Sequence, residues 1–156
     1  MHYTKNDCLI CERIALIKKG NNPHFVIELD STYVVLGDHQ FYKGYTLLLS
    51  KIHTPELHLL PSKFKQKLLM EVSIVGEAVY KTFYPNKLNY ELLGNEVQHI
   101  HWHLFPRYLD DPNISMPVWT TNKRIRNSNK YMPTPQQLNL YKKGLLKEIK
   151  LLYPNK

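Results

Sequence analysis

The feature that most constrains this sequence is a run in which histidine and apolar side chains alternate. His99, His101 and His103 are separated by Ile100 and Trp102. Because successive side chains of a β-strand point to opposite faces, the alternation predicts a strand with three imidazoles on one face and an apolar set packed on the core. Imidazoles about 6.6 Å apart along a strand can act on one polyphosphate or serve two separate sites.

The residues around this run predict more strands and two substantial helices. Strands are expected at 25–29, 32–36, 44–50, 88–93 and 98–108, and a helix capped by Ser62 at 62–84. Strands that follow one another without intervening helices favour an antiparallel sheet, which predicts an α+β fold.

Smaller units are expected at the two ends of the chain. A unit at about 7–20 contains Cys8-x-x-Cys11 and a short helix at 11–19. A C-terminal helix at about 134–152 begins with a capping box at Thr134 and Gln137, after a long polar loop that contains prolines. The length of 156 residues fits one domain covering 1–156.

The composition excludes some classes of protein and leaves others open. No apolar run approaches the ~20 residues of a membrane span, and residues 1–7 lack the apolar core of a secretory signal. A cytoplasmic protein without a membrane partner is therefore expected. The net charge of +8 favours anionic ligands without choosing among nucleotides, nucleic acids and lipid headgroups. The basic stretch 123–130 has no interleaved aromatic residue, so it does not indicate a stacking platform for single-stranded nucleic acid.

Three imidazoles on one strand face suit chemistry on a phosphate. Neutral imidazole is nucleophilic near pH 7 and can form a covalent intermediate with a phosphoryl or nucleotidyl group. One ring nitrogen attacks while the other keeps its proton, held by a hydrogen bond to a carbonyl. Arg107, just downstream, is a candidate phosphate contact, and a solvated surface arginine is the alternative.

The Cys-x-x-Cys pair has the spacing of ligands in a structural zinc site. Two histidines would complete a tetrahedral set, and the residues alone do not select them. A thioredoxin-like redox motif needs a preceding strand and a βαβ unit, which are not visible here. Two reduced structural cysteines are a further alternative. The candidate ligands are His2, His24, His39, His53, His58, His99, His101 and His103.

Residues 89–108, which contain the histidine run, resemble the His-φ-His-φ-His-φ-φ signature of the histidine-triad (HIT) superfamily, where φ is apolar. They are especially similar to bacterial HIT proteins of the diadenosine polyphosphate hydrolase-like kind. The order of motifs agrees over roughly residues 7–110. The resemblance implies a five-stranded antiparallel sheet with helices on one face, and a homodimer.

The resemblance also implies roles for individual residues. The middle histidine, His101, would be the nucleophile that becomes transiently nucleotidylated, and His103 would contact the phosphates and the leaving group. Asn95, four residues before the first histidine, would hold the α-phosphate or the bridging oxygen with an amide one methylene shorter than glutamine. Asp38 lies near the position that contacts the ribose.

In zinc-containing relatives the first histidine of the triad joins two cysteines and a histidine that follows a strand end. For this chain the resemblance therefore implies a structural zinc ion held by Cys8, Cys11, His53 and His99.

The function expected from these features is hydrolysis or transfer at the α-phosphate of nucleotidyl substrates, such as dinucleoside polyphosphates or nucleoside phosphoramidates. A hydrolase and a phosphorylase would differ only in the second acceptor. One alternative is a nucleotide-binding regulatory protein with little turnover. Another is deadenylation of nucleic-acid ends, which is disfavoured because DNA-directed relatives usually carry an additional zinc finger and this chain has 2 cysteines.

Overall fold

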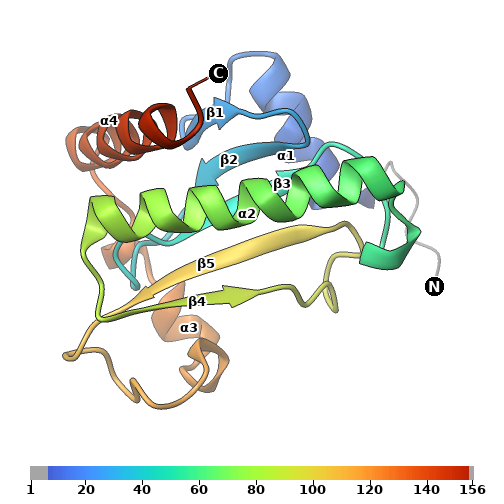
Figure 1. Cartoon of the computed structure of the whole chain (residues 1–156). Coiled ribbons are helices and arrows are strands. Elements are labelled where there is room, and N and C mark those ends of the chain that lie inside the picture. Colours follow the sequence, from blue (N-terminus) through green and yellow to red (C-terminus); the bar gives the residue numbers. More distant parts are fainter. Residues whose placement is uncertain (1–6, 155–156) are drawn as a thin grey trace.

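Five strands form one antiparallel sheet in the computed structural model, which describes residues 7–154 (Figure 1). The strands are ordered β1-β2-β3-β5-β4 across the sheet. All four neighbouring pairs are antiparallel, which confirms the predicted α+β fold. His2, a candidate ligand in the sequence, lies outside the described residues. The strands span Phe25–Glu28 (β1), Thr32–Leu36 (β2), Thr46–Ser50 (β3), Lys87–Glu91 (β4) and His101–Arg107 (β5).

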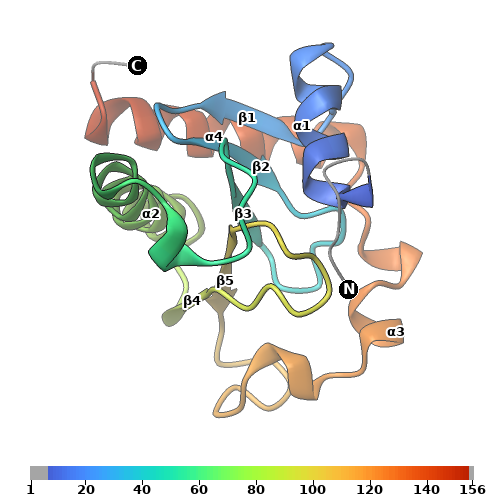
Figure 2. The same ribbon diagram turned by 90° about the vertical axis from the view of Figure 1, so that its right-hand side faces the viewer.

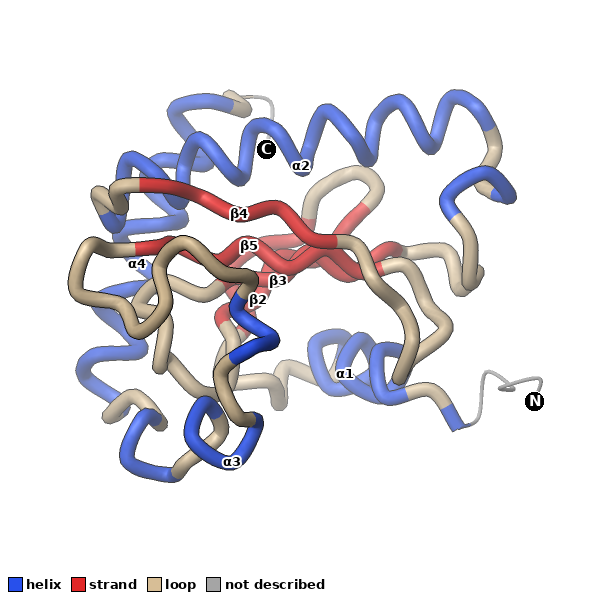
Figure 3. The backbone as a smooth tube through the Cα atoms, turned by 90° about the horizontal axis from the view of Figure 1, so that it is seen from below, coloured by secondary structure: helices blue, strands red, loops and turns tan. Residues whose placement is uncertain are grey.

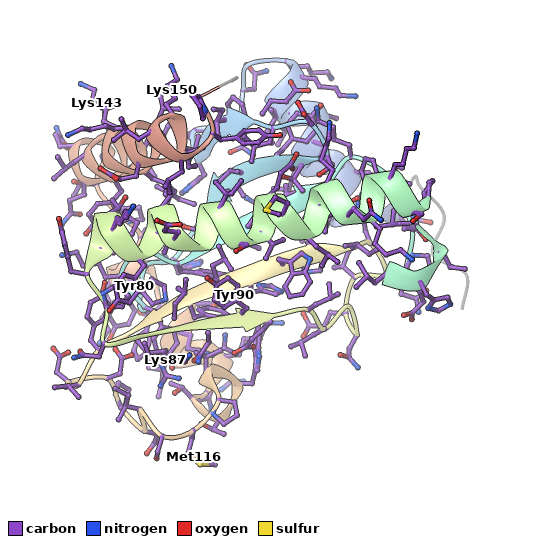
Figure 4. The ribbon with its side chains drawn as sticks, in the orientation of Figure 1. Tyr80, Lys87, Tyr90, Met116, Lys143 and Lys150 are labelled. Carbon is purple, nitrogen blue, oxygen red and sulfur yellow. The ribbon has the colours of Figure 1, made fainter. Side chains whose placement is uncertain are left out.

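Two long helices, α2 (Ser62–Phe83) and α4 (Pro135–Leu152), cover one face of the sheet. Their buried apolar side chains pack against strand residues such as Leu48 and Leu104, neither of which is exposed to solvent. Gly76 of α2 leaves room for Tyr90 of β4, because a Cβ at position 76 would lie 2.1 Å from the tyrosine hydroxyl (Figure 4).

Helix α1 (Leu9–Lys18) packs on the opposite face, so the expectation of helices on one face only is wrong. Figures 2 and 3 show α1 and the short helix α3 (Lys123–Arg126) on the side of the sheet away from α2. The reason lies in strand alternation: Tyr33, Val35 and Leu49 point away from α2 and need apolar cover, which Ile10, Ile14 and Ile17 of α1 supply. This second face is also the histidine face, because Leu49 pairs with His101 across β3 and β5.

Several predicted boundaries differ from the structure. Strand β5 begins at His101 instead of residue 98, because the amide of Ile100 donates to the Thr54 carbonyl and that of His99 to Val97 within the loop. Ser62 is the first residue of α2 and not its cap. Helix α1 begins earlier than expected, with the Cys8 sulfur accepting a hydrogen bond from the Cys11 amide.

The C-terminal helix is confirmed as the sequence predicts it. Thr134 and Gln137 form the expected capping box, and Pro135 occupies the first turn. Lys143 and Lys150 lie on the exposed side of α4 and point away from the sheet (Figure 4). Among the described residues, no helix combines the length and the apolar character that crossing a membrane requires.

Candidate functional site

A pocket of about 480 Å³ opens on the histidine face of the sheet. Its walls come from α1, from the ends of β2 and β3, from β5, from the 93–97 loop and from the 119–127 segment. The pocket brings together the four residues to which the family resemblance assigns catalytic or substrate-binding roles. These are Asp38, Asn95, His101 and His103.

His101 is held with one ring nitrogen against the backbone. Its Nδ1 lies 2.6 Å from the carbonyl oxygen of His99, so Nδ1 carries the proton and donates it to that carbonyl. The lone pair of the neutral ring is then on Nε2. Burial lowers the pKa of His101, an effect that the hydrogen bond to His99 partly offsets. A neutral ring with a free Nε2 is the state that a nitrogen nucleophile needs.

His103 is held through its Nδ1 by Tyr45, whose hydroxyl lies 2.6 Å away. Burial lowers the pKa of His103 most strongly, and Coulombic interactions with His101 and Arg126 add to the shift, so that the pKa is about 3. Burial also raises the pKa of the Tyr45 hydroxyl, which therefore stays protonated and can donate to Nδ1. That arrangement leaves the proton of His103 on Nε2, as a donor. The ring centroids of His101 and His103 are 4.7 Å apart.

Tyr45 can reach His103 because Gly37 has no side chain. A Cβ at position 37 would lie 2.1 Å from the Tyr45 ring. The ring stacks on Phe105 with centroids 4.1 Å apart, which fixes its orientation. The sequence alone did not single out Tyr45. The one signal that could have indicated it is its position directly before β3, in alternation with Leu47 and Leu49, which pair with His103 and His101.

Asp38 lies in the pocket as a member of an ion pair. Arg13 of α1 contacts both carboxylate oxygens, with one hydrogen bond of 2.7 Å to Oδ1. Burial by itself would raise the pKa of Asp38, but the hydrogen bond and charge of Arg13 outweigh it and lower the pKa. The carboxylate is therefore ionised and oriented at the pocket wall.

Asn95 lies on the exposed 93–97 loop at the mouth of the pocket. Its neighbour Glu96 accepts two hydrogen bonds of 3.0 Å from Lys123 of α3. This pair ties the Asn95 loop to the C-terminal segment across the opening. An exposed ion pair of this kind contributes about 0–1 kcal/mol, so the connection is weak.

Cys8, Cys11, His53 and His99 converge beside the pocket into a group that could hold a metal ion. Their ligand atoms all lie within 4.8 Å of one another. His99 Nδ1 is 3.5 Å from both sulfurs and 3.2 Å from His53 Nδ1, while His53 Nδ1 is 3.3 Å from the Cys11 sulfur. His99 Nε2 lies 2.8 Å from the Ser50 carbonyl, a contact that places the ring proton on Nε2 and the lone pair on Nδ1, the atom that faces the other ligand atoms.

Arg107 is not brought to the pocket. Its side chain is 2% exposed, so it is neither a phosphate contact in this structure nor the solvated surface arginine of the alternative reading. Nε donates to Asp111 at 3.0 Å, and the terminal nitrogens donate to Asn89 and to the carbonyls of Met116 and Asn113. Arg107 thus anchors the loop that leads from β5 to the 119–127 segment.

The 119–127 segment contributes pocket residues that the sequence analysis missed. Trp119 meets the ring of His103 edge to face with centroids 5.5 Å apart, and the Arg126 guanidinium lies 4.8 Å from the centre of the Trp119 ring. The basic stretch 123–130 contains no interleaved aromatic residue. The aromatic partner of Arg126 is Trp119, which lies outside that stretch, and the contact forms only when the segment folds back on itself.

Comparison with known proteins identifies relatives over most of the chain. A family model described as the HIT domain matches residues 18–110. The chain is 30% identical to the "Protein hit" of Bacillus subtilis, over 78% of this chain and 84% of the relative. It is 29% identical to an uncharacterized HIT-like protein of Mycoplasma genitalium, over 81% of this chain and 91% of the relative.

A yeast relative and a solved structure extend this comparison. Adenosine 5'-monophosphoramidase HNT1 of Saccharomyces cerevisiae is 28% identical over 64% of this chain and 62% of its own length. The crystal structure of a histidine triad protein from Marinobacter aquaeolei superposes with a TM-score of 0.71. That structure is 27% identical and covers 83% of this chain and 90% of its own.

Proposed function

The chain belongs to the HIT domain family, and we propose that it cleaves nucleotidyl substrates at the α-phosphate through a nucleotidyl intermediate on His101. Family membership supports a nucleotide hydrolase or transferase at the general level. The observation that carries the specific proposal is the 2.6 Å contact between His101 Nδ1 and the His99 carbonyl. This contact keeps the proton on Nδ1, so the unprotonated Nε2 of a buried, neutral imidazole is the atom that attacks.

The reaction has two displacement steps. In the first, the Nε2 lone pair forms a bond to the α-phosphorus while the bond from phosphorus to the departing oxygen or nitrogen breaks. The departing atom takes the electron pair, and a departing amine also takes a proton from water. In the second step, a water oxygen bonds to the phosphorus and passes a proton to the solvent, while the bond between phosphorus and Nε2 breaks and its electron pair returns to His101. If phosphate replaced water as the acceptor, the protein would be a phosphorylase.

The neighbouring residues have complementary roles in this proposal. His103 offers its Nε2–H to a phosphate oxygen or to the leaving group, in a tautomer that the Tyr45 hydroxyl selects. The amide of Asn95 holds the α-phosphate or the bridging oxygen from the mouth of the pocket. Asp38, oriented by Arg13, accepts hydrogen bonds from a ribose.

Two classes of substrate fit this site. Dinucleoside polyphosphates and nucleoside phosphoramidates share the nucleotidyl half that His101 attacks and differ in the departing group. The resemblance to diadenosine polyphosphate hydrolase-like proteins favours the first class. The name of the yeast relative, an adenosine 5'-monophosphoramidase, favours the second. Pairing into a homodimer stays a prediction.

The metal proposed for the cluster is a structural zinc ion held by Cys8, Cys11, His53 and His99. A tetrahedral ion with Zn–S of about 2.3 Å and Zn–N of about 2.0–2.1 Å places sulfur and nitrogen ligands about 3.6 Å apart and two nitrogens about 3.4 Å apart. The observed separations of 3.3–3.5 Å and 3.2 Å fit these edges. With four protein ligands the ion would have no open position for substrate, so it would stabilise the fold around the catalytic strand.

The test is a panel of both substrate classes followed by mass spectrometry of the quenched protein. A nucleotidyl adduct on His101 is expected, and His101→Ala is expected to lose the adduct and at least about 10⁴-fold in kcat. His58→Ala serves as the matched control, since His58 is exposed and does not line the pocket. Unchanged hydrolysis by His101→Ala would overturn the proposal, and nucleotide binding without turnover would favour the regulatory alternative.

A further inference from the structure

Arg126 is distinguished among the cations that line the pocket. The other two are paired with carboxylates: Arg13 with Asp38, and Lys123 with Glu96. Within residues 7–154, Arg126 has no ion pair. Its Nε donates to the Thr121 carbonyl at 2.9 Å, and its guanidinium lies on Trp119. It therefore supplies the pocket's uncompensated positive charge among the described side chains.

The fold holds this guanidinium close to the third histidine. Val118 is fully buried against Tyr42 and Phe105, which fixes the start of the segment. Trp119 then packs on both Phe105 and His103, with centroids 5.6 and 5.5 Å apart. The Arg126 guanidinium lies on the Trp119 ring, and this ring packs against His103. Arg126 is therefore held on the side of the pocket where His103 lies.

Electrostatics agree with this placement. Burial lowers the pKa of His103 most strongly, and Coulombic interactions with His101 and Arg126 add to the shift. His103 is consequently neutral in the pH range where a neutral His101 can attack. For a phosphate on this side of the pocket, Arg126 would supply a positive charge. The neutral His103 would supply a hydrogen-bond donor but no charge. A guanidinium suits this task, because its planar N–H groups match the oxygens of a phosphate.

We propose that Arg126, seated on Trp119, binds the departing group of the substrate and selects for departing groups that carry phosphate. The inference rests on the proposed function and specifies the leaving-group half of the substrate. When the bond between the α-phosphorus and the bridging oxygen breaks, the departing phosphate takes the electron pair and gains negative charge. A guanidinium beside it stabilises that charge in the transition state. A departing neutral amine gains no net negative charge, so Arg126 contributes little to its release.

The test compares two variants of α3 on two substrates. Arg126→Gln removes the proposed contact, while Arg124→Gln is the matched control, because Arg124 is exposed on the same helix and does not line the pocket. For a dinucleoside tetraphosphate, Arg126→Gln is expected to lower kcat/KM by about 10–100-fold. For an adenosine phosphoramidate with a neutral amine, the expected loss is under about 3-fold. Arg124→Gln is expected to stay within about 3-fold of the wild type on both, since exposed charges act weakly.

Two kinetic outcomes would overturn the inference. Equal losses on both substrates would place Arg126 on the shared nucleotidyl half, and no loss on the tetraphosphate would exclude a phosphate contact altogether.

Binding of inorganic tripolyphosphate, measured by calorimetry, separates this inference from the proposed function. Arg126→Gln is expected to weaken binding by about 10-fold relative to the wild type and Arg124→Gln, the loss of one charge-assisted contact. If the wild type turned over neither substrate, the proposed function would fail while this measurement still tested Arg126. Equal affinity in the wild type and Arg126→Gln would refute the anion site itself.

Discussion

The carbonyl oxygen of His99 accepts a hydrogen bond from Nδ1 of His101 across 2.6 Å. The ring of His99 belongs to the group formed with Cys8, Cys11 and His53. One residue therefore connects the candidate metal site to the proposed nucleophile. Any change that lets the His99 peptide group move also releases the proton-bearing nitrogen of His101, so the two sites are expected to respond together.

Loss of the metal is expected to destabilise the protein. Cys11→Ser should remove one ligand and most of the bound zinc. If zinc is present at 1,000 times its Kd, its loss costs about 4 kcal/mol, which lowers Tm by roughly 8–16 °C in a chain of this size. Metal analysis and thermal denaturation check this, with His58→Ala as a variant that keeps the metal. A metal-free wild type that folds with the same Tm would contradict the zinc site.

Removing the Tyr45 hydroxyl is expected to impair turnover more than binding. Tyr45→Phe leaves Nδ1 of His103 without its partner and no longer selects the tautomer that keeps a proton on Nε2. We expect kcat to fall by about 10–100-fold, less than the roughly 10²–10³-fold lost with a donor that contacts the reacting oxygen directly, and KM to change by less than about 3-fold. Steady-state kinetics measure the separate changes in kcat and KM, and the ¹⁵N chemical shifts of the His103 ring report its tautomer. A rise in KM alone would assign Tyr45 to substrate binding.

His103 is expected to make folding stability depend on pH. Its pKa is about 3 in the folded protein, where burial disfavours the charge, and about 6.5 in the unfolded chain. Above pH 6.5 both states are neutral and this residue adds no dependence. As the pH falls from 6.5 towards 3, only the unfolded chain takes up the proton, so stability falls by up to about 1.4 kcal/mol per pH unit.

Urea denaturation at a series of pH values checks this slope. His103→Gln is expected to show a shallower decline below pH 6.5, with a remainder from His101, whose pKa burial also lowers. The exposed His58→Gln variant is expected to follow the wild type. Identical slopes for the wild type and His103→Gln would show that His103 is not held neutral.

Arg107 is expected to matter for stability and for the shape of the pocket. Arg107→Met would leave Asp111, whose side chain is 10% exposed, without its ion-pair partner. Breaking a buried pair in this way costs about 3–5 kcal/mol. The loop to Trp119 would loosen as well, because its Met116 and Asn113 carbonyls lose the hydrogen bonds that Arg107 donates. Denaturant unfolding measures the loss, and the exposed Arg124→Met is the control. If Arg107→Met were as stable as the wild type but bound phosphate more weakly, Arg107 would be a direct phosphate contact.

The local pattern of the chain was enough to predict the antiparallel α+β class and the start of the C-terminal helix. Alternation predicts that Ile100 and Leu104 face the core, and the capping box at Thr134 predicts the start of α4, because strand periodicity and helix caps depend only on neighbouring residues. The resemblance of the histidine run added the grouping of His53 and His99 with the two cysteines, which spacing alone did not select.

Tertiary structure decided which charges reach the pocket. Arg107 is the last residue of the histidine strand and shares the histidine face by alternation, yet the loop that follows buries it among carbonyls and Asp111. Arg126 is far from that strand in sequence, yet packing of Val118 and Trp119 against Phe105 returns it to His103. No local periodicity encodes such a return, because it depends on contacts between residues that the chain brings together only when the whole sheet has formed.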